Sequence, residues 1–338
     1  LKQTKNIIGI NSMKICFLDG VKTPYTSQDL YTNKIRGAEN IIINLSSSFS
    51  KMGHKVIVYN NCVKNLLIEN VYWKNINYLK EKPTFDIAIT NNDIRLLDKI
   101  DAKKKLAISH SIQTLEKFVR KKQLLSYLYN KPKIILLGDY HYQKRFILLR
   151  LFGSFKTDWA VDNIFINRQI EINNKPNNAI FTSHSDRNLD LLVKIWRDYI
   201  FPRNLNQKLF ITPLKMNLKK FNIYNRMFSN KYNLIKDLIN ARLLLIPGHK
   251  AELFCISAEE GRELCIPIVT LGIGSLKERV LHGETGFIAN NEKEFSYFTD
   301  LLFNDDNLYQ KIRINLFKLR GSKNWPNIAK LFLKKINE

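Results

Sequence analysis

The sequence predicts an α/β protein made of two doubly wound parallel sheets, and two observations lead to that expectation. Short apolar runs alternate with longer amphipathic segments, which is the pattern of parallel strands covered by helices. The alternation passes through two cycles, separated by the polar, asparagine-rich stretch 166–178. With 338 residues, the chain is also about twice the size of a usual single domain. We therefore predict a first unit over 1–175, a second over 176–320 and a closing helix over 321–338.

The first cycle opens with the apolar run MKICFL, and we expect the residues before it to form a leader outside the fold. Apolar residues that recur with a helical period predict two long helices in this half. Short apolar runs rich in β-branched residues predict the strands that alternate with them. The expected strands are 13–18, 55–59, 86–90, 105–109 and 133–138, and the expected helices are 38–52 and 113–128.

The second cycle repeats the alternation after the asparagine-rich stretch. Its strands are again short and apolar, and a brief helix is expected from Ser257. Two helices finish the unit, and one more amphipathic helix follows Gly321. The expected strands are 179–183, 208–212, 242–247 and 267–271, and the expected helices are 188–198, 231–240, 292–303, 306–318 and 325–336.

The charge balance predicts acidic partners. The chain carries 54 Lys and Arg against 30 Asp and Glu, a formal charge of +24, which attracts polyanions. Three interpretations stay open: nucleic acid, the anionic face of a membrane, or a lysine-rich bias that only solubilises the surface. No RNA-binding signature, zinc spacing or basic helix-turn-helix pattern accompanies the charge, which argues against nucleic acid.

Cellular location can be inferred from what the sequence contains. No stretch approaches the roughly 18 consecutive apolar residues that span a bilayer, and the opening residues do not have the pattern of a signal peptide. The four cysteines are scattered without paired short spacing, which predicts reduced thiols and neither a disulfide framework nor a metal site. We expect a cytoplasmic protein, with contact to the inner face of the membrane as an extension of that expectation. The cysteines are Cys16, Cys62, Cys255 and Cys265.

The segment 247–287 carries the densest candidate chemistry. An apolar strand ends at Pro247, a loop carries Glu252, and the helix that starts near Ser257 holds Glu260 in its first turns. Free N–H groups at a helix start bind phosphate well, and carboxylates beside them accept hydrogen bonds from sugar or ribose hydroxyls. The plain alternative is two solvated surface glutamates.

The segment ELFCISAEE, followed by CIPIV and GIGSLKERVLHGETGF, resembles the donor-binding signature of glycosyltransferase family 4. That resemblance implies the GT-B fold, in which two Rossmann-like domains face each other across a cleft. It also implies that Glu260 binds the ribose of a nucleotide and that Glu252 contacts the transferred sugar. The chain departs from the family pattern at Cys255 and Cys265, which often are glycine, and at Ile273. The backbone expected against the diphosphate and sugar belongs to Phe254, Cys255, Ile256 and Ser257.

A second match lies in FTSHSDRNLDLLVKIW (181–196), which is similar to the family's element that presents cations to the diphosphate. By that resemblance Arg187 is the leading candidate, because a guanidinium can neutralise charge that develops on a departing diphosphate. His184 occupies the neighbourhood where many members carry another arginine. The plain alternative for Arg187 is pairing with Asp186 or Asp190.

The first unit contributes further candidates. RGAENIIINLSSSFSKMGHKVIVY (36–59) resembles the family's glycine-rich loop and helix, so Arg36 and Gly37 are expected to face the ligand. Relatives often place a histidine at the position of His110, facing the donor sugar. The segment 117–150 interleaves basic residues with aromatic ones, which suits an ordinary amphipathic helix first and an anionic membrane or RNA second.

Taken together, the residues and the resemblance predict a retaining, metal-independent glycosyltransferase. Its donor would be a UDP- or GDP-sugar, its acceptor a glycan or a lipid-linked sugar, and no cofactor would be needed. The expected setting is cell-surface polysaccharide or glycolipid biosynthesis. The alternatives are a basic nucleic-acid-binding protein and a GT-B nucleotide-sugar epimerase. A dehydrogenase is disfavoured because GIGSLK (272–277) lacks the third glycine of the dinucleotide fingerprint.

Overall fold

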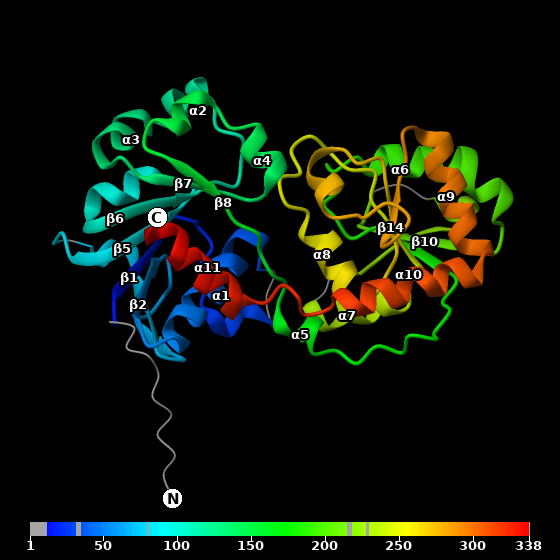
Figure 1. Cartoon of the computed structure of the whole chain (residues 1–338), viewed down its shortest axis with the longest axis horizontal. Helices are drawn as coiled ribbons and strands as arrows, with labels where there is room; N and C mark the ends of the chain where they lie inside the picture. The colour runs from blue at the N-terminus through cyan, green and yellow to red at the C-terminus, as the bar shows by residue number, and fades with distance from the viewer. Residues whose placement is uncertain (1–11, 32–34, 80, 215–217, 228–229, 338) are drawn as a thin grey trace, which may run out of the picture.

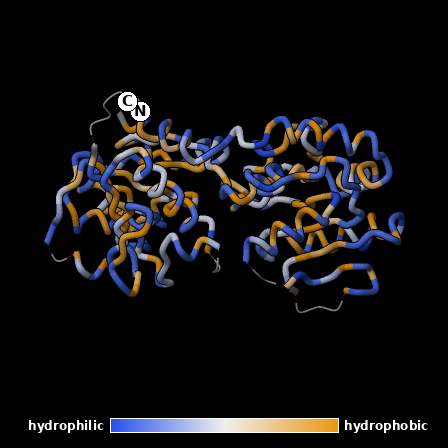
Figure 2. The backbone as a smooth tube through the Cα atoms, turned by 90° about the horizontal axis from the view of Figure 1, so that it is seen from below, coloured by the Kyte–Doolittle hydropathy of each residue, from blue (hydrophilic) through white to orange (hydrophobic). Residues whose placement is uncertain are grey.

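The computed structural model shows two α/β lobes side by side, joined by two chain crossings (Figure 1). Each lobe has its own sheet and its own buried cores, and Figure 2 shows the hydrophobic segments concentrated inside each lobe. The structure describes residues 12–31, 35–79, 81–214, 218–227 and 230–337. The leader expected before residue 13 therefore falls almost entirely outside the described residues.

The first lobe is built on an eight-stranded sheet in the order β3-β4-β2-β1-β5-β6-β7-β8, in which only β3 runs antiparallel to its neighbour. β1 lies inside this sheet, where Ile15 pairs with Val56 on one side and with Ile87 on the other. Its continuous apolar run suits a strand that is covered on both faces. The strands are β1 (Lys14–Asp19), β2 (Lys55–Asn60), β3 (Leu66–Ile68), β4 (Val71–Asn75), β5 (Thr84–Asn91), β6 (Asp101–Ile108), β7 (Lys133–Leu136) and β8 (Ser154–Lys156).

The second lobe is built on a six-stranded, fully parallel sheet in the order β11-β10-β9-β12-β13-β14. The strand order reverses between β9 and β12, which pair directly with each other. Ligands of open α/β sheets bind at such a reversal, beyond the carboxyl ends of the strands. The strands are β9 (Asn178–Ile180), β10 (Lys208–Ile211), β11 (Ile223–Asn225), β12 (Leu243–Leu245), β13 (Ile268–Thr270) and β14 (Gly286–Ile288).

Helices cover the sheets with their apolar faces. In α1, for example, Ile41, Ile42, Leu45 and Phe49 are buried at helical spacing against the sheet core. The helices are α1 (Gly37–Lys51), α2 (Leu115–Arg120), α3 (Leu124–Asn130), α4 (Asp139–Gln143), α5 (Asn163–Ile166), α6 (Leu189–Ile195), α7 (Lys231–Ile239), α8 (Ile256–Glu263), α9 (Glu292–Asn304), α10 (Asp306–Leu319) and α11 (Trp325–Asn337).

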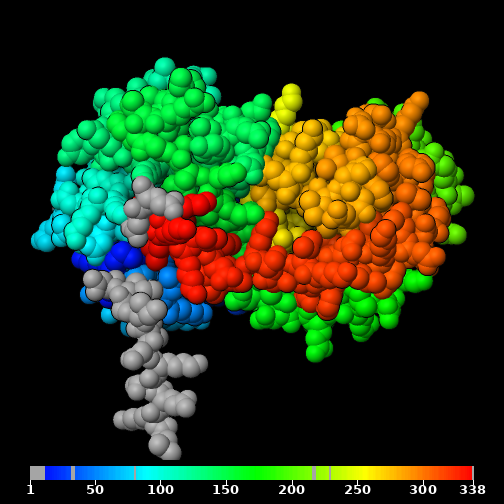
Figure 3. Space-filling model, viewed as in Figure 1, coloured from blue at the N-terminus to red at the C-terminus, as the bar shows by residue number. Residues whose placement is uncertain are grey.

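The chain returns to the first lobe at its end, where α11 packs against α1. The ring of Phe332 lies 5.8 Å from that of Phe49 and 5.7 Å from that of Phe155, measured between centroids. Figure 3 shows this C-terminal segment running from the second lobe across the surface of the first. The crossing buries the apolar stripe of α11, so the last helix contributes to the core of the lobe where the chain began.

Two expectations about helices are wrong in detail. Residues 113–128 do not form one helix, because Lys122 adopts a left-handed conformation (φ 54°) that separates α2 from α3. The basic segment 117–150 is likewise not one amphipathic helix, since it contains strand β7 and the short helix α4. Among the described helices, none combines the length and apolar character needed to cross a bilayer.

Candidate active site

The candidate residues of the second lobe gather where its strand order reverses. The chain leaves β9 and runs into the loop that carries His184 and Arg187, and it leaves β12 and runs into the loop that carries Glu252. Because β9 and β12 are parallel neighbours, their two loops emerge at the same edge of the sheet. Asn188 ties the loops together, since its side-chain amide donates to the carbonyl of Gly248.

Arg187 and Glu252 face each other across this edge. The Arg187 Nε atom lies 3.5 Å from Oε2 of Glu252, and Oε1 of the same carboxylate accepts a hydrogen bond of 3.2 Å from the Cys255 N–H. Burial raises the pKa of Glu252, while the nearby Arg187 guanidinium lowers it. Arg187 also lies 3.8 Å from Asp186. The arginine thus pairs with the other candidate residue as well as with its chain neighbour.

The start of α8 lies directly after this pair. Cys255 caps the helix in a left-handed conformation (φ 57°). Glycine adopts this conformation most easily, which explains why relatives often have glycine at this position. Within the described chain, the N–H groups of Ile256 and Ser257 have no hydrogen-bond acceptor. The Ser257 hydroxyl lies 3.3 Å from that of Ser183, just after β9. Open N–H groups and hydroxyls at a helix start form a ready site for an anion.

α8 is unusual because it is polar and yet buried. Ser257 to Glu263 all lie out of solvent, and three of these residues are glutamates. Gly261 allows the close packing, since a Cβ there would lie 2.5 Å from Cδ2 of Leu244 on β12. Glu260 is buried in α8, and the Glu252 side chain in the preceding loop is 18% exposed, which contradicts the alternative of two solvated surface glutamates. Buried carboxylates are costly unless partners compensate them.

Glu260 lies in the second turn of α8 beside a polar cluster that joins the two lobes. Burial raises its pKa to about 8; Lys231 and Arg226 act to lower that pKa and Asp162 to raise it. Lys231, at the start of α7, is bonded to the carboxylate of Asp162. Asn44 of α1 donates to the same carboxylate at 2.8 Å. The sequence did not predict this cluster, because no local pattern indicates contacts between residues as far apart in the chain as Asn44, Asp162 and Lys231.

The second lobe also holds a cavity of about 880 Å³ beside α7. Arg226 and Asp237 line part of it and are joined by hydrogen bonds of 2.9 and 3.1 Å from the guanidinium to one carboxylate oxygen. Arg226 is also one of the cations that act to lower the pKa of Glu260.

His110 follows β6 in the first lobe. Its backbone N–H donates to the Asn92 side chain at 2.9 Å, and its ring Nε2 is buried without a hydrogen-bond partner among the described residues. Burial, with a contribution from His141, lowers the pKa of His110 to about 4. The imidazole is therefore neutral at pH 7.

The other first-lobe candidates and His184 are more loosely placed. Arg36 is exposed and precedes α1 without a side-chain capping bond, and Gly37 opens the helix with free space where a Cβ would stand. His184 is exposed and its Nδ1 lies 2.9 Å from Asp186. Phe254 is engaged from within the protein, because the guanidinium of Arg279 lies 4.3 Å from its ring centroid. Its backbone remains part of the loop before α8.

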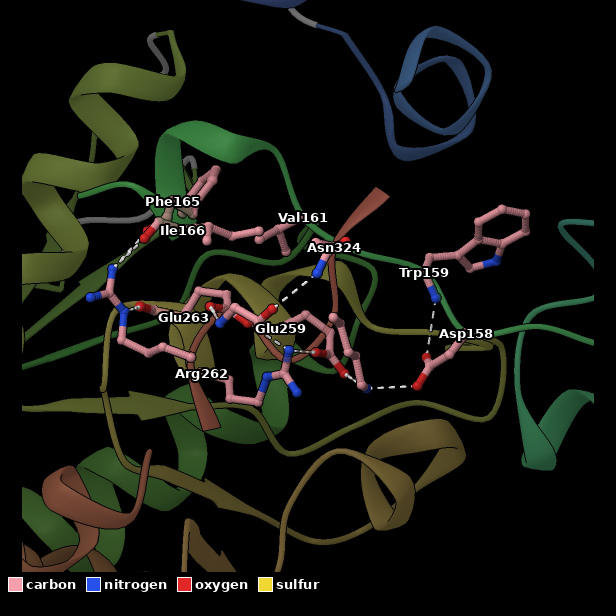
Figure 4. A network of polar contacts seen from close by, with 12 residues as sticks. Asp158, Trp159, Val161, Phe165, Ile166, Glu259, Arg262, Glu263 and Asn324 are labelled. Carbon is pink, nitrogen blue, oxygen red and sulfur yellow. Dashed lines mark hydrogen bonds and ion pairs between the residues drawn. The ribbon is translucent and has the colours of Figure 1, made fainter. Parts of the chain in front are cut away.

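An ion network around the buried helix α8 fixes it to the chain segments that connect the lobes (Figure 4). Glu259 accepts from Arg279 at 2.8 Å and from Lys323 at 2.9 Å, and both cations also pair with Asp158. Burial opposes ionisation of Asp158, yet Arg279 and Lys323 lower its pKa overall. Glu263 pairs with Arg262 at 2.6 Å. Segment 157–166, α8 and the return segment before α11 are thereby held together.

This arrangement is suited to holding an anion that carries hydroxyl groups. Arg187 and the open start of α8 supply positive potential, while Glu252 and Glu260 supply carboxyl groups on either side. Nothing in the described ranges resembles a metal centre, since no three His, Cys, Asp or Glu side chains are grouped to hold an ion. The four cysteines are buried and unpaired.

The architecture of the two lobes resembles that of known structures. It is similar to that of Anabaena Alr3699/HepE in complex with UDP and glucose, with a TM-score of 0.71 and 13% identity over 96% of this chain and 100% of that chain. The chain has the GT-B fold.

Further GT-B structures agree in fold. A glycosyltransferase from Rickettsia africae ESF-5 gives a TM-score of 0.66 and 13% identity over 96% of this chain and 98% of that chain. WaaG, a glycosyltransferase involved in lipopolysaccharide biosynthesis, gives a TM-score of 0.66 and 14% identity over 95% of this chain and 99% of that chain. No protein-family model and no curated protein matches the sequence. At these identities the shared GT-B fold is the extent of the likeness.

Proposed function

We propose that this chain is a retaining, metal-independent glycosyltransferase that moves a sugar from a nucleotide diphosphate sugar to a glycan or lipid-linked acceptor. The observation that carries the proposal is the Arg187–Glu252 pair beside the open start of α8. A diphosphate sugar needs cations and N–H groups at the phosphates and carboxyl groups at the hydroxyls, and this edge of the sheet offers both. GT-B neighbours that are glycosyltransferases support the same reaction class.

In this proposal Arg187 and the N–H groups of Ile256 and Ser257 bind the diphosphate. As the bond between sugar and phosphate breaks, negative charge grows on the leaving group, and donors already in place stabilise it without reorganising. Glu260 accepts hydrogen bonds from the ribose hydroxyls, and Glu252 from the transferred sugar. His110 approaches that sugar from the first lobe with its free ring nitrogen.

For the proposed retaining mode, the engagement of Glu252 favours front-face attack over a covalent intermediate on the enzyme. Its carboxylate already accepts from the Cys255 N–H and pairs with Arg187, so it is held as a binding group instead of an attacking nucleophile. The acceptor would attack from the face that the diphosphate leaves, and the departing phosphate would take the acceptor's proton. Arg187 and α8 would perform the charge neutralisation that a metal ion performs in other transferases.

The donor is proposed to be a UDP-sugar ahead of a GDP-sugar. Three solved complexes of HepE contain UDP, UDP with glucose, and UDP-glucose, and their TM-scores to this chain are 0.69 to 0.71. With Glu260 at the ribose, the nucleobase would extend toward Arg226 and the cavity beside α7.

The proposed acceptor is a cell-surface glycan or a lipid-linked sugar held in a membrane. The first lobe offers a surface that suits a membrane. We call a set of exposed basic and apolar side chains on α2, α3, the 3-10 helix η4 (Ile147–Arg150) and the turns beside these elements the basic-apolar surface. α3 and η4 are neighbours, because the Tyr127 hydroxyl donates to the Leu148 carbonyl at 2.9 Å. Exposed apolar groups among cations suit the headgroup region of an anionic bilayer. The surface comprises Val119, Arg120, Lys121, Lys122, Leu125, Tyr129, Lys144, Ile147, Arg150 and Leu151.

Calorimetric titration with UDP, GDP and ADP tests the donor site. We expect one nucleoside diphosphate to bind selectively and Glu260→Ala to weaken it. Glu284→Ala provides the matched control, because Glu284 is an exposed glutamate of the same lobe. Binding of a single-stranded oligonucleotide without any nucleoside diphosphate would replace the proposal with a basic nucleic-acid-binding protein. Conversion of the donor sugar without transfer would replace it with an epimerase.

A further inference from the structure

A side chain of the second lobe caps a helix of the first lobe, and this contact joins the two lobes. Glu278 ends the 3-10 helix η8 (Gly274–Glu278) of the second lobe, and its carboxylate accepts the backbone N–H groups of Asp139, at 2.8 Å, and Tyr140. Those residues open α4 of the first lobe. The first N–H groups of a helix lack partners within the helix, and a carboxylate there also meets the positive end of its dipole.

The first lobe is shaped to receive this carboxylate. Gly138 precedes α4 with a φ of 151°, and a Cβ there would lie 2.7 Å from Oε2 of Glu278 and 3.0 Å from Nη2 of Arg279. Any side chain at position 138 would take the space that the Glu278 carboxylate now occupies. The charged groups around Glu278 are Arg279, at 3.5 Å, and the Lys156–Asp139 ion pair on the α4 side.

On the second-lobe side, the contact is continuous with the Glu252 loop. The Ser275 N–H, at the start of η8, donates to the Glu252 carbonyl at 2.9 Å. The Tyr140 hydroxyl of α4 reaches the same loop and donates to the Lys250 carbonyl at 2.9 Å. A shift of α4 relative to η8 would therefore act directly on the loop that positions Glu252.

On the first-lobe side, the contact is continuous with the His110 loop. His141 of α4 is fully buried, its Nε2 lies 3.2 Å from the Ser111 carbonyl, and its Nδ1 accepts from the Leu137 N–H at 3.2 Å. The neutral imidazole that donates through Nε2 and accepts through Nδ1 satisfies both bonds. α4 is thus fixed to the residue that follows His110.

We propose that Glu278 is a positioning residue that latches the lobes in the orientation that brings Glu252 and His110 to the same donor sugar. This inference rests on the proposed transferase function for its catalytic consequence, whereas the latch itself is a matter of lobe orientation. The contacts of the Glu278 carboxylate are the N–H groups of Asp139 and Tyr140 and the Arg279 guanidinium, so we assign it no direct contact with donor or acceptor. It acts through α4 and η8, each of which is bonded to a loop that carries a candidate catalytic residue.

The orientation of the lobes is the direct readout. Spin labels at Leu125→Cys in the first lobe and Tyr297→Cys in the second report the distance between lobes, since both residues are exposed and the four native cysteines are buried. We expect Glu278→Ala to lengthen and broaden the distance distribution. Glu278→Gln should have an intermediate effect, because its single amide oxygen replaces a carboxylate that accepts two N–H groups. Glu284→Ala should leave the distribution unchanged.

A second variant approaches the same contact from the other lobe. Gly138→Ala places a methyl group where Glu278 now lies, so it should open the lobes as Glu278→Ala does, with the second lobe's own sequence intact. Agreement of the two variants would separate a latch from local misfolding of η8. An unchanged distance distribution in both, with the fold intact, would overturn the inference.

The kinetic readout separates positioning from donor binding. UDP should bind Glu278→Ala as it binds the unaltered protein, because the proposed UDP-binding groups all belong to the second lobe. Sugar transfer should fall in kcat by about 10²-fold, the loss expected when reacting groups are displaced by about 1 Å. Open lobes in a protein that does not turn over any sugar nucleotide would refute the transferase and leave the latch standing. Closed lobes with normal turnover would refute the latch alone.

Discussion

Arg187 and Glu252 lie on loops 65 residues apart in the chain, yet the Nε of one is 3.5 Å from Oε2 of the other. Adjacent parallel strands bring the loops together, and the ion pair has consequences for both residues. The guanidinium opposes the rise that burial causes in the pKa of Glu252. The carboxylate in turn holds the guanidinium at the edge where α8 begins. Any change to Arg187 is therefore felt by Glu252.

Arg187→Ala should lower kcat for sugar transfer by about 10²- to 10³-fold, the usual loss when one preorganised donor to a developing charge is removed. UDP binding should weaken far less, because the open N–H groups of α8 remain. Steady-state kinetics together with calorimetry measures the two effects separately. The matched control is Arg197→Ala, an exposed arginine of the same lobe that pairs with its neighbour Asp198. Unchanged turnover in a folded Arg187→Ala protein would refute the leaving-group role.

Donor binding should depend on pH through Glu260, whose pKa burial raises to about 8 in the free protein. Ribose hydroxyls donate to a carboxylate better than to a neutral carboxyl group, so the donor should favour the ionised form and release a proton on binding at pH 7. Affinity for UDP should rise with pH up to about 8 and level off above it. Calorimetry in two buffers of different ionisation enthalpy measures the proton release.

The Glu260 carboxyl group should also make the free energy of unfolding depend on pH. Its folded pKa lies above the unfolded value near 4.5, so its contribution to the free energy of unfolding is full below about pH 4.5 and is lost as pH rises through about 8. Glu260→Gln should abolish both pH effects, since an amide does not titrate. A pH dependence that persists in Glu260→Gln would assign the titration to another group.

The fold could be predicted from sequence because its signals are local. The continuous apolar run of β1 and the helical spacing of Ile41, Leu45 and Phe49 specify elements without reference to the rest of the chain. Short edge strands such as β3 and β11 lack that signal and were not predicted. The break between α2 and α3 was missed because one residue, Lys122, takes a left-handed conformation that its type does not favour.

The candidate site could be read from the sequence only where its residues lie close together along the chain. Glu252, Ser257 and Glu260 fall within nine residues, so their spacing can be read. Lys231 and Asp162, which lie beside Glu260, are 69 residues apart and belong to no motif. Glu278 lies in the segment that resembles the family signature, but its hydrogen bonds to the α4 backbone could not be predicted. Every residue type except proline has a backbone N–H group, so the sequence does not indicate which one binds a side chain.

Membrane binding should follow from the basic-apolar surface of the first lobe. Leu125 and Ile147 are 80% and 68% exposed, and burying such side chains in a bilayer interface releases free energy in proportion to their apolar area. The double variant Leu125→Ser and Ile147→Ser should sediment less with vesicles rich in anionic lipid. Leu205→Ser, which alters a 62% exposed leucine of the second lobe, should sediment like the unaltered protein. Equal sedimentation of both variants would leave the net charge as the cause of binding.

His110 should matter for the sugar and not for the nucleotide. Its ring Nε2 has no partner among the described residues, and burial keeps the imidazole neutral by lowering its pKa to about 4. A neutral ring can exchange a hydrogen bond with a sugar hydroxyl across the whole range from pH 5.5 to 8. His110→Ala should therefore weaken binding of UDP-sugar relative to UDP by about tenfold, or about 1.4 kcal/mol, which is the upper end of the net contribution of a hydrogen bond.

The pH dependence provides the control for that role. If His110 acted as a general base that titrates near neutrality, kcat would fall below about pH 6.5 and the fall would disappear in His110→Ala. The lowered pKa predicts instead that the profiles of the two proteins run parallel between pH 5.5 and 8. His110→Asn should recover part of the lost affinity, because its amide is also a neutral group that can donate and accept. An unchanged affinity ratio in His110→Ala would remove His110 from the sugar site while leaving Glu252 and Arg187 in place.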